Sequence, residues 1–213
     1  MHRFYLVLLS LLTTLAYGQS FDRLGTPFVK NYNTHEMGFD KKTWSITQNK
    51  DGILYFANGR KILEFDGERW KKIVIPNEHV NRSLFAVSSD SLYVGLDGDY
   101  GVLKRSDNGD FSFDSLFSFN KEETAIIEDF WKVHKYKNYQ IFQTFRNLYV
   151  YDGSLTTKIP APFRFKWSTM VDKDFYVNDT KYGLFKFSGT NLMPVISDPL
   201  SVSYTHLTLP TKA

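Results

Sequence analysis

Apolar and polar residues alternate in short runs along most of the chain. Examples are LYFAN from Leu54, LYVGL from Leu92 and FYVND from Phe175, and polar turns containing Asp-Gly or Asn-Gly separate the runs. A two-residue period of this kind predicts half-buried β-strands. Asp-Gly and Asn-Gly pairs supply the positive φ angles that tight hairpins need. We therefore expect an all-β protein.

The same succession of strands and turns occurs four times. Each copy has a strand, a polar turn, a second strand, a short link, a third strand and a turn that closes on a glycine. These glycines are spaced 42, 44 and 36 residues apart, at Gly67, Gly109, Gly153 and Gly189. The segments KKIVIP, FSFDSLF and LTTKIP each offer a fourth strand. Four strands per repeat at a period of about 40 residues predict the blades of a β-propeller.

The predicted fold is a partial β-propeller of about four blades, each with four antiparallel strands, truncated from a larger ring. The blades are placed at about 44–80, 81–126, 127–164 and 165–201, after an extended lead-in at 19–43. An ordinary β-sandwich, which also consists of hairpins, is the alternative. A sandwich does not require a fourfold repeat with a constant closing turn.

The first residues resemble an export signal. A short basic segment with Arg3 precedes the apolar run from Phe4 to Leu15, and Ala16-Tyr17-Gly18 follows as a small-x-small site. This order predicts a signal peptide at 1–18 that is cleaved after Gly18. A membrane anchor is the alternative, but the apolar run is too short to span a bilayer.

Composition narrows the possible functions. The chain has no cysteine, which excludes disulfides, thiol nucleophiles and thiolate metal sites. Its formal charge is +3, and about +1 remains once Arg3 and Lys212 at the ends are left out. No basic stripe is present, so we expect no nucleic-acid contact. The aromatic content of 17% favours strands.

No catalytic motif is present, and we expect no catalytic residue, no metal site and no cofactor. A nucleophile elbow, a P-loop and an HExxH motif are all missing. The histidines His35, His79 and His134 do not have the spacing of metal ligands. Asp97-Gly98-Asp99 is interpreted as a turn rather than a calcium loop.

Two further groups of residues leave alternatives open. The acidic residues Glu122, Glu123, Glu128 and Asp129 could provide a carboxylate pair for glycoside hydrolysis. A solvated helix start capped by Asn120 is the more typical explanation. The four tryptophans could stack on sugars, but packing between blades is expected for those that open inner strands: Trp44, Trp131 and Trp167.

Candidate ligand-binding residues lie in the longest loops, which is where propellers and other rigid scaffolds place function. They are Asp99 and Tyr100 in the loop of the second blade, and Trp131 at the end of the insertion that precedes the third blade.

Two segments carry a resemblance to a known family. GTPFVKNY followed by WSITQNKDGILYFANGRKILEFDGERW, and then GLDGDYGVL, resemble the two-component-regulator propeller proteins that are common in Bacteroidetes. The resemblance implies an extracytoplasmic sensor whose later parts are further blades, a β-sandwich with a triple-tyrosine motif, a membrane helix, and a histidine-kinase or helix-turn-helix output module. It also implies a periplasmic location at the Gram-negative inner membrane, or secretion if the gene is short, and it is compatible with a homodimer. A membrane anchor is expected only in the missing C-terminal part.

The last residues differ from the rest. VSYTHLTLPT at 202–211 resembles the translation of a transposase-end sequencing adapter. We therefore expect 202–213 to be a non-native tail and the chain to be a fragment.

The leading functional hypothesis is a non-enzymatic propeller that senses an unknown small molecule or glycan in a signal-transduction regulator. The alternatives are an exported propeller enzyme acting on glycans, either a lyase or a hydrolase, and a cell-surface scaffold protein. Fold alone does not decide between them.

Overall fold

The protein is described by a computed structural model that covers residues 29–34, 38–75, 79–116, 128–189 and 191–196. The signal peptide, Asn120, His35 and the adapter-like tail lie outside these residues. The chain divides into two compact units, 1–33 and 34–213. All strands of the described residues belong to the second unit.

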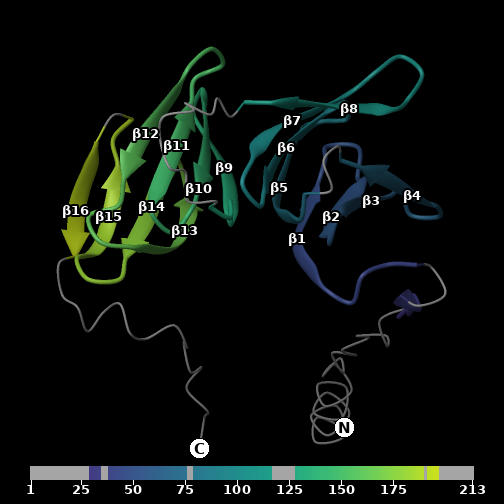
Figure 1. Cartoon of the computed structure of the whole chain (residues 1–213), viewed down its shortest axis with the longest axis horizontal. Coiled ribbons are helices and arrows are strands. Elements are labelled where there is room, and N and C mark those ends of the chain that lie inside the picture. Colours follow the sequence, from purple (N-terminus) through teal and green to yellow (C-terminus); the bar gives the residue numbers. More distant parts are fainter. Residues whose placement is uncertain (1–28, 35–37, 76–78, 117–127, 190, 197–213) are drawn as a thin grey trace, which may run out of the picture. The chain divides into compact units, whose positions relative to one another are not determined.

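The second unit is made of four antiparallel sheets, each with four strands in sequence order (Figure 1). Sheet 1 contains β1 (Thr43–Gln48), β2 (Leu54–Asn58), β3 (Lys61–Phe65) and β4 (Trp70–Val74). Sheet 2 contains β5 (Asn81–Ser88), β6 (Ser91–Leu96), β7 (Tyr100–Arg105) and β8 (Phe111–Ser115). Sheet 3 contains β9 (Lys132–Tyr136), β10 (Tyr139–Gln143), β11 (Asn147–Tyr151) and β12 (Thr156–Pro160). Sheet 4 contains β13 (Phe165–Val171), β14 (Asp174–Asp179), β15 (Gly183–Phe187) and β16 (Leu192–Ile196).

The core consists of three apolar clusters, one between each pair of successive sheets. Tyr55 and Ile62 of sheet 1 pack with Leu92 and Val94 of sheet 2. The second cluster joins Tyr100 of sheet 2 to sheet 3, and the third joins sheet 3 to sheet 4. These clusters place the bulk of the core between the sheets.

Both faces of the two middle sheets are therefore covered. In β10, Ile141 belongs to the cluster toward sheet 4, whereas its neighbour Phe142 belongs to the cluster toward sheet 2. A β-sandwich covers only one face of each sheet. The structure thus confirms the all-β prediction with four four-stranded antiparallel sheets, and the packing is that of propeller blades rather than of a sandwich.

Sharp turns occur where the sequence predicts them. Gly67, Gly109, Gly153 and Gly189, which close the repeats, all have positive φ angles between 86° and 107°. An L-residue rarely adopts that conformation, which explains why glycine stands at these positions.

Three first strands begin with a β-bulge that the sequence did not predict. The register shifts between Thr43 and Ser45 and between Asn81 and Ser83, and again at the start of β13. The extra residues in the first two bulges are Trp44 and Arg82. A bulge re-aims the side chain of its extra residue. Both residues lie at the end of the sheet where the link from the preceding segment arrives, which we call the link end. The turns between second and third strands lie at the same end.

Candidate functional site

A pocket of about 420 Å³ lies at the link end of sheets 3 and 4. Three segments line it: the residues that lead into β9, the turn between β10 and β11, and the link from β12 to β13. The lining residues are Glu128, Asp129, Trp131, Phe145, Arg146, Phe163 and Arg164. The volume is within the range of about 300–1,000 Å³ that is typical of small-molecule sites.

Aromatic rings form much of the pocket wall. The rings of Trp131 and Phe145 lie 5.5 Å apart, centroid to centroid. The guanidinium of Arg164 lies 4.4 Å from the centre of the Phe145 ring, within the range of a cation–π contact. Phe163 is exposed. The wall therefore offers flat apolar surface beside a fixed positive charge.

A second cation holds Trp131 in place from outside the pocket lining. The guanidinium of Arg82 lies 4.8 Å from the ring of Trp44 and 5.0 Å from that of Trp131. Its Nε donates to Oδ1 of Asp129 at 2.8 Å. The bulge residues of sheets 1 and 2 thus pack against the tryptophan that precedes β9. The side chains of Arg82 and Asp129 are 18% and 31% exposed, so the ion pair is partly shielded from water and salt.

Glu128 is a further lining residue that is held in place by several hydrogen bonds. Its side chain is only 12% exposed. Its Oε2 accepts from the hydroxyl of Thr144 at 2.7 Å and from Nδ2 of Asn147 at 3.0 Å, and the hydroxyl of Tyr149 lies at 3.4 Å. The expectation of a solvated acidic face is therefore wrong for Glu128. This carboxylate is a structural acceptor that ties the turn between β10 and β11 to the segment before β9.

The groups that remain open in the pocket are mainly donors. The side chain of Arg146 is 59% exposed, and its Nε is 4.0 Å from Oε1 of Glu128. The guanidinium of Arg164 forms no ion pair with any described residue. The buried indole Nε1 of Trp131 finds no acceptor in the described part of the chain. An unmade buried hydrogen bond of this kind costs about 1–3 kcal/mol.

Of the three predicted ligand-binding residues, the structure brings only Trp131 to the pocket. Tyr100 is 1% exposed and packs against Phe130, Phe142 and Tyr149, with centroids 4.7, 4.5 and 5.4 Å away. We therefore leave Tyr100 out of the candidate site, because its ring belongs to the core.

Asp99 lies at the link end of sheet 2, outside the pocket lining. Its Oδ1 accepts from the backbone N–H of Tyr100 at 2.6 Å and from the hydroxyl of Ser115 at 2.8 Å. Burial raises the pKa of the Asp99 carboxyl, and these two hydrogen bonds oppose the rise. The carboxylate thus has local partners that explain its position without a ligand.

The neighbouring Asp97 connects this loop to the pocket. It forms a β-bridge with Asp129, and its Oδ1 accepts from the backbone N–H of Val80 at 2.6 Å. Nδ1 of His79 lies 2.7 Å from the Asp97 carbonyl oxygen.

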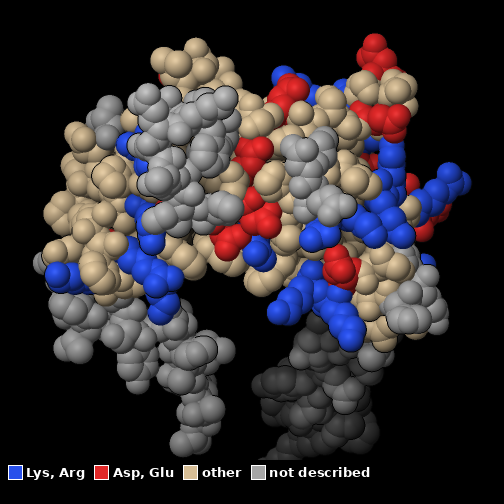
Figure 2. Space-filling model, viewed as in Figure 1, with Lys and Arg blue, Asp and Glu red and all other residues tan. Residues whose placement is uncertain are grey.

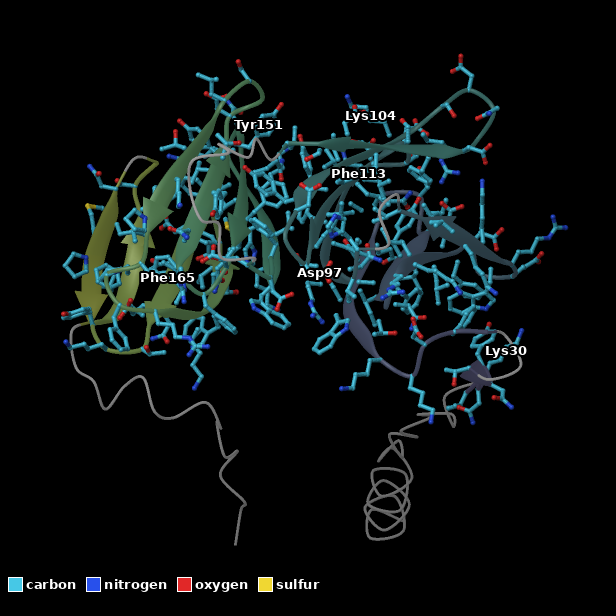
Figure 3. All side chains as sticks on the ribbon, in the orientation of Figure 1. Lys30, Asp97, Lys104, Phe113, Tyr151 and Phe165 are labelled. Carbon is cyan, nitrogen blue, oxygen red and sulfur yellow. The ribbon has the colours of Figure 1, made fainter. Side chains whose placement is uncertain are left out.

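Carboxylates gather near the centre of the visible face in Figure 2, and Figure 3 labels Asp97 in the same area. Asp97-Gly98-Asp99 forms the turn between β6 and β7, and Gly98 has a φ of 83°.

The sequence reasoning missed most of the pocket. Phe145, Arg146, Phe163 and Arg164 lie in two turns that are well separated along the chain and carry no motif. Trp44 contacts residues of other blades, as expected, with its ring 5.7 Å from that of Trp131 and beneath the guanidinium of Arg82, but the residue is 42% exposed and lies outside the core clusters. The available signal was positional: turns that follow second strands and links that precede first strands meet at one end of a propeller.

A neutral hydrogen-bond network lies between sheets 3 and 4. Nε2 of His134 is 2.9 Å from Oγ of Ser168, whose hydroxyl donates to Oε1 of Gln143. Since that hydroxyl has one proton, Oγ accepts from His134 and Nε2 carries the imidazole proton. Burial lowers the pKa of His134 to about 4, with a smaller effect from the charge of Lys132.

No group of three or more histidine, aspartate or glutamate side chains in the described ranges has the geometry of a metal site. Within the same ranges, no helix combines the length and apolar character that crossing a membrane requires.

The chain matches no known family model and no curated protein. Solved structures do resemble it. The extracellular domain of the putative hybrid two component system BT4673 from B. thetaiotaomicron aligns with a TM-score of 0.56 and 13% identity, over 74% of this chain and 22% of that one. A streptogramin B lyase aligns with a TM-score of 0.56 and 16% identity, over 75% of this chain and 57% of that one. The WD40 β-propeller domain of Doa1 aligns with a TM-score of 0.54 and 9% identity, over 73% of this chain and 54% of that one.

The chain thus spans between about a fifth and three fifths of the length of these structures. Sensor domains, lyases and WD40 domains share one architecture with it at identities below 25%, and such similarity identifies the fold alone. Together with the three clusters between sheets, these comparisons show that the chain has the β-propeller fold.

Proposed function

We propose that this chain is the ligand-sensing part of an extracytoplasmic signal-transduction regulator and that it acts by binding rather than by catalysis. The single observation that carries the proposal is the pocket beside Trp131. It combines flat aromatic walls with a few fixed charged groups, which is the usual composition of a small-molecule site. The likeness to the extracellular domain of a two component system supports the same choice.

Binding would produce a signal through differential affinity. A ligand shifts a conformational equilibrium only when it binds one of the two states more tightly. The pocket draws its lining from both sheet 3 and the link into sheet 4, so an occupant would favour the arrangement in which Trp131, Phe145 and Arg164 are closest. A regulator could read that preference through the parts that follow the propeller.

The alternative of a glycan-active lyase or hydrolase is supported by the likeness to a streptogramin lyase. The pocket argues for binding because its carboxylates are already engaged. Glu128 accepts several hydrogen bonds and Asp129 is paired with Arg82. A general acid or base needs a group that is free to exchange a proton with the substrate.

The test is a ligand-observed NMR screen with a mixed library of small organic acids, amines and oligosaccharides. We expect at least one compound to bind the wild-type protein, to lose binding in Trp131→Ala, and to be recovered chemically unchanged after a day. The matched control is Tyr182→Ala, which removes an exposed ring outside the pocket lining. Turnover of the bound compound, or equal binding by both variants, would overturn the proposal.

A further inference from the structure

We propose that the pocket beside Trp131 selects a small aromatic carboxylate. This inference rests on the proposed binding function and adds the chemical class of the ligand. It follows from a count of which hydrogen-bonding groups in the pocket lining are occupied and which are open.

The acceptors of the lining are largely occupied. Both carboxylate oxygens of Glu128 face donors of the turn between β10 and β11. Oδ1 of Asp129 accepts from Arg82, which leaves Oδ2 as the open carboxylate oxygen of the described lining. Backbone carbonyls are engaged as well. Those of Phe145, Arg146 and Arg164 accept from backbone N–H groups at 2.9, 2.7 and 2.8 Å.

The open charged groups are two guanidinium donors. Arg146 is largely exposed, and Arg164 has a ring beneath it but no carboxylate partner among the described residues. A guanidinium presents its N–H groups in a planar fork that matches a carboxylate. A ligand rich in acceptors would therefore be paired in this pocket. A polyol would bring several hydroxyl donors to a lining whose open carboxylate oxygen is Oδ2 of Asp129, so it would be matched less well than a carboxylate.

The apolar part of the lining is flat. Trp131, Phe145 and Phe163 all present aromatic rings to the pocket. Aromatic rings pack best against other rings in offset or edge-to-face arrangements. The structure thus matches a ligand whose ring lies against these side chains and whose carboxylate reaches the arginines. The pocket volume of about 420 Å³ is ample for one or two such rings.

The experiment is isothermal titration of the whole chain with four probes: benzoate, benzamide, cyclohexanecarboxylate and D-glucuronate. We expect benzoate to bind most tightly. Benzamide, which has the same shape without the charge, should bind at least about 10-fold more weakly, because charged hydrogen bonds are the stronger ones. Cyclohexanecarboxylate and glucuronate should also be weaker, since they lack the flat ring.

Variants locate the interaction. Arg164→Ala should weaken benzoate binding about 10-fold or more, whereas the benzamide affinity should change little. The matched control, Arg69→Ala, removes the same charge from an exposed turn between β3 and β4 and should leave benzoate binding unchanged. Two results together would support the proposal. Wild type should bind benzamide weakly, and benzoate affinity should fall in Arg164→Ala but not in Arg69→Ala.

Other outcomes would overturn it. If benzamide binds as well as benzoate, the arginines do not select the ligand. If glucuronate binds more tightly and loses affinity in Arg164→Ala, the pocket is a sugar-acid site, so the aromatic class is wrong although the proposed sensing function stands. If no probe binds but the library screen finds a Trp131-dependent ligand of another class, the inference fails alone. If neither experiment finds a ligand, both proposals fail.

Discussion

At the link ends of sheets 3 and 4, a carboxylate joins the incoming segment to the end of the second strand or to the turn after it, and we call this contact a tether. The two sheets form the tether in opposite directions. In sheet 4 the carboxylate belongs to the end of the second strand. Oδ2 of Asp179 accepts from the backbone N–H groups of Phe163 and Arg164 in the incoming link, at 2.8 and 2.9 Å. In sheet 3 the carboxylate belongs to the incoming segment instead, and Glu128 reaches the turn through Thr144 and Asn147.

The other two sheets follow the arrangement of sheet 4. The side chain of Asn58, at the end of β2, accepts from the backbone N–H of Asp40 at 2.7 Å. Asp97, just after β6, accepts from the backbone N–H of Val80. Sheet 3 is therefore the exception among the four.

Because the carboxylate of Glu128 comes from the incoming segment, the turn side chains Phe145 and Arg146 are left free to line a pocket. Reversing the direction of one tether can thus create a site without a change of fold.

Breaking the tether of sheet 4 should have the largest effect. Asp179→Ala removes a fully buried carboxylate that also accepts from the N–H groups of Lys181 and Tyr182. We expect the free energy of unfolding to fall by about 4 kcal/mol, because buried backbone donors lose their acceptor. Urea unfolding followed by fluorescence measures this change.

The control for that variant is Asp110→Ala, an exposed carboxylate 3.5 Å from Lys71. An exposed pair of this kind contributes at most about 1 kcal/mol. If both variants lose the same small amount, the tether of sheet 4 does not carry the stability assigned to it.

Acid should weaken the contact between sheets 3 and 4 at His134. His134 lies between sheets 3 and 4, and its pKa of about 4 in the folded state is below the ordinary value of 6.5. The unfolded chain therefore binds the extra proton first. The stability that depends on neutral His134 is present in full above pH 6.5 and is lost as the pH falls toward 4, by about 3 kcal/mol.

The measurement is the free energy of unfolding at several pH values for wild type and His134→Gln, which does not titrate. The difference between the two proteins should shrink as the pH falls from 6.5 to 4. Parallel pH profiles would show that His134 is not held neutral by this contact.

Weakening the tether of sheet 3 should cost less than breaking that of sheet 4. Glu128→Gln keeps one acceptor oxygen but turns an amide toward the donors Thr144 and Asn147. We expect a loss of about 2 kcal/mol, together with weaker ligand binding, because the turn that carries Phe145 is no longer fixed. Glu68→Gln, in an exposed turn of sheet 1, is the matched control and should be neutral. Unchanged stability and binding in Glu128→Gln would contradict the reversed tether.

Arg146→Ala should separate binding from stability. The side chain is largely exposed and 4.0 Å from Glu128, so its removal should change the free energy of unfolding by less than about 0.5 kcal/mol. Benzoate affinity should nevertheless fall. A large loss of stability would show that Arg146 is part of the tether, and an unchanged affinity would remove it from the site.

The fold was more predictable than the site for a physical reason. Strands such as Leu54–Asn58 and Asp174–Asp179 can be predicted from the local alternation of apolar and polar residues. Turns such as that at Gly153 can be predicted from glycine, whose backbone adopts positive φ angles. The pocket depends on contacts between residues distant along the chain. Trp131 was found because it ends a long insertion. Arg164 was missed because its approach to Phe145 depends on how two sheets pack.

The bulges and tethers could not be predicted either, because they too depend on contacts between residues that are distant along the chain. Nothing local in the sequence shows that Trp44 and Arg82 are extra residues in their strands, since a bulge is defined by the register with the partner strand. The engagement of Glu128 likewise depends on Asn147, which lies in the following β-hairpin. Such features require the three-dimensional structure.

The most direct test of the account follows the indole N–H resonances of the four tryptophans while benzoate is added. Trp131→Phe assigns the resonance of interest, and Trp70 in sheet 1 serves as the internal reference. We expect a saturable shift of the Trp131 resonance below about 10 mM benzoate, with that of Trp70 unmoved. A Trp131 resonance that stays still over this range, or four resonances that drift together, would contradict the claim that this pocket selects an aromatic carboxylate.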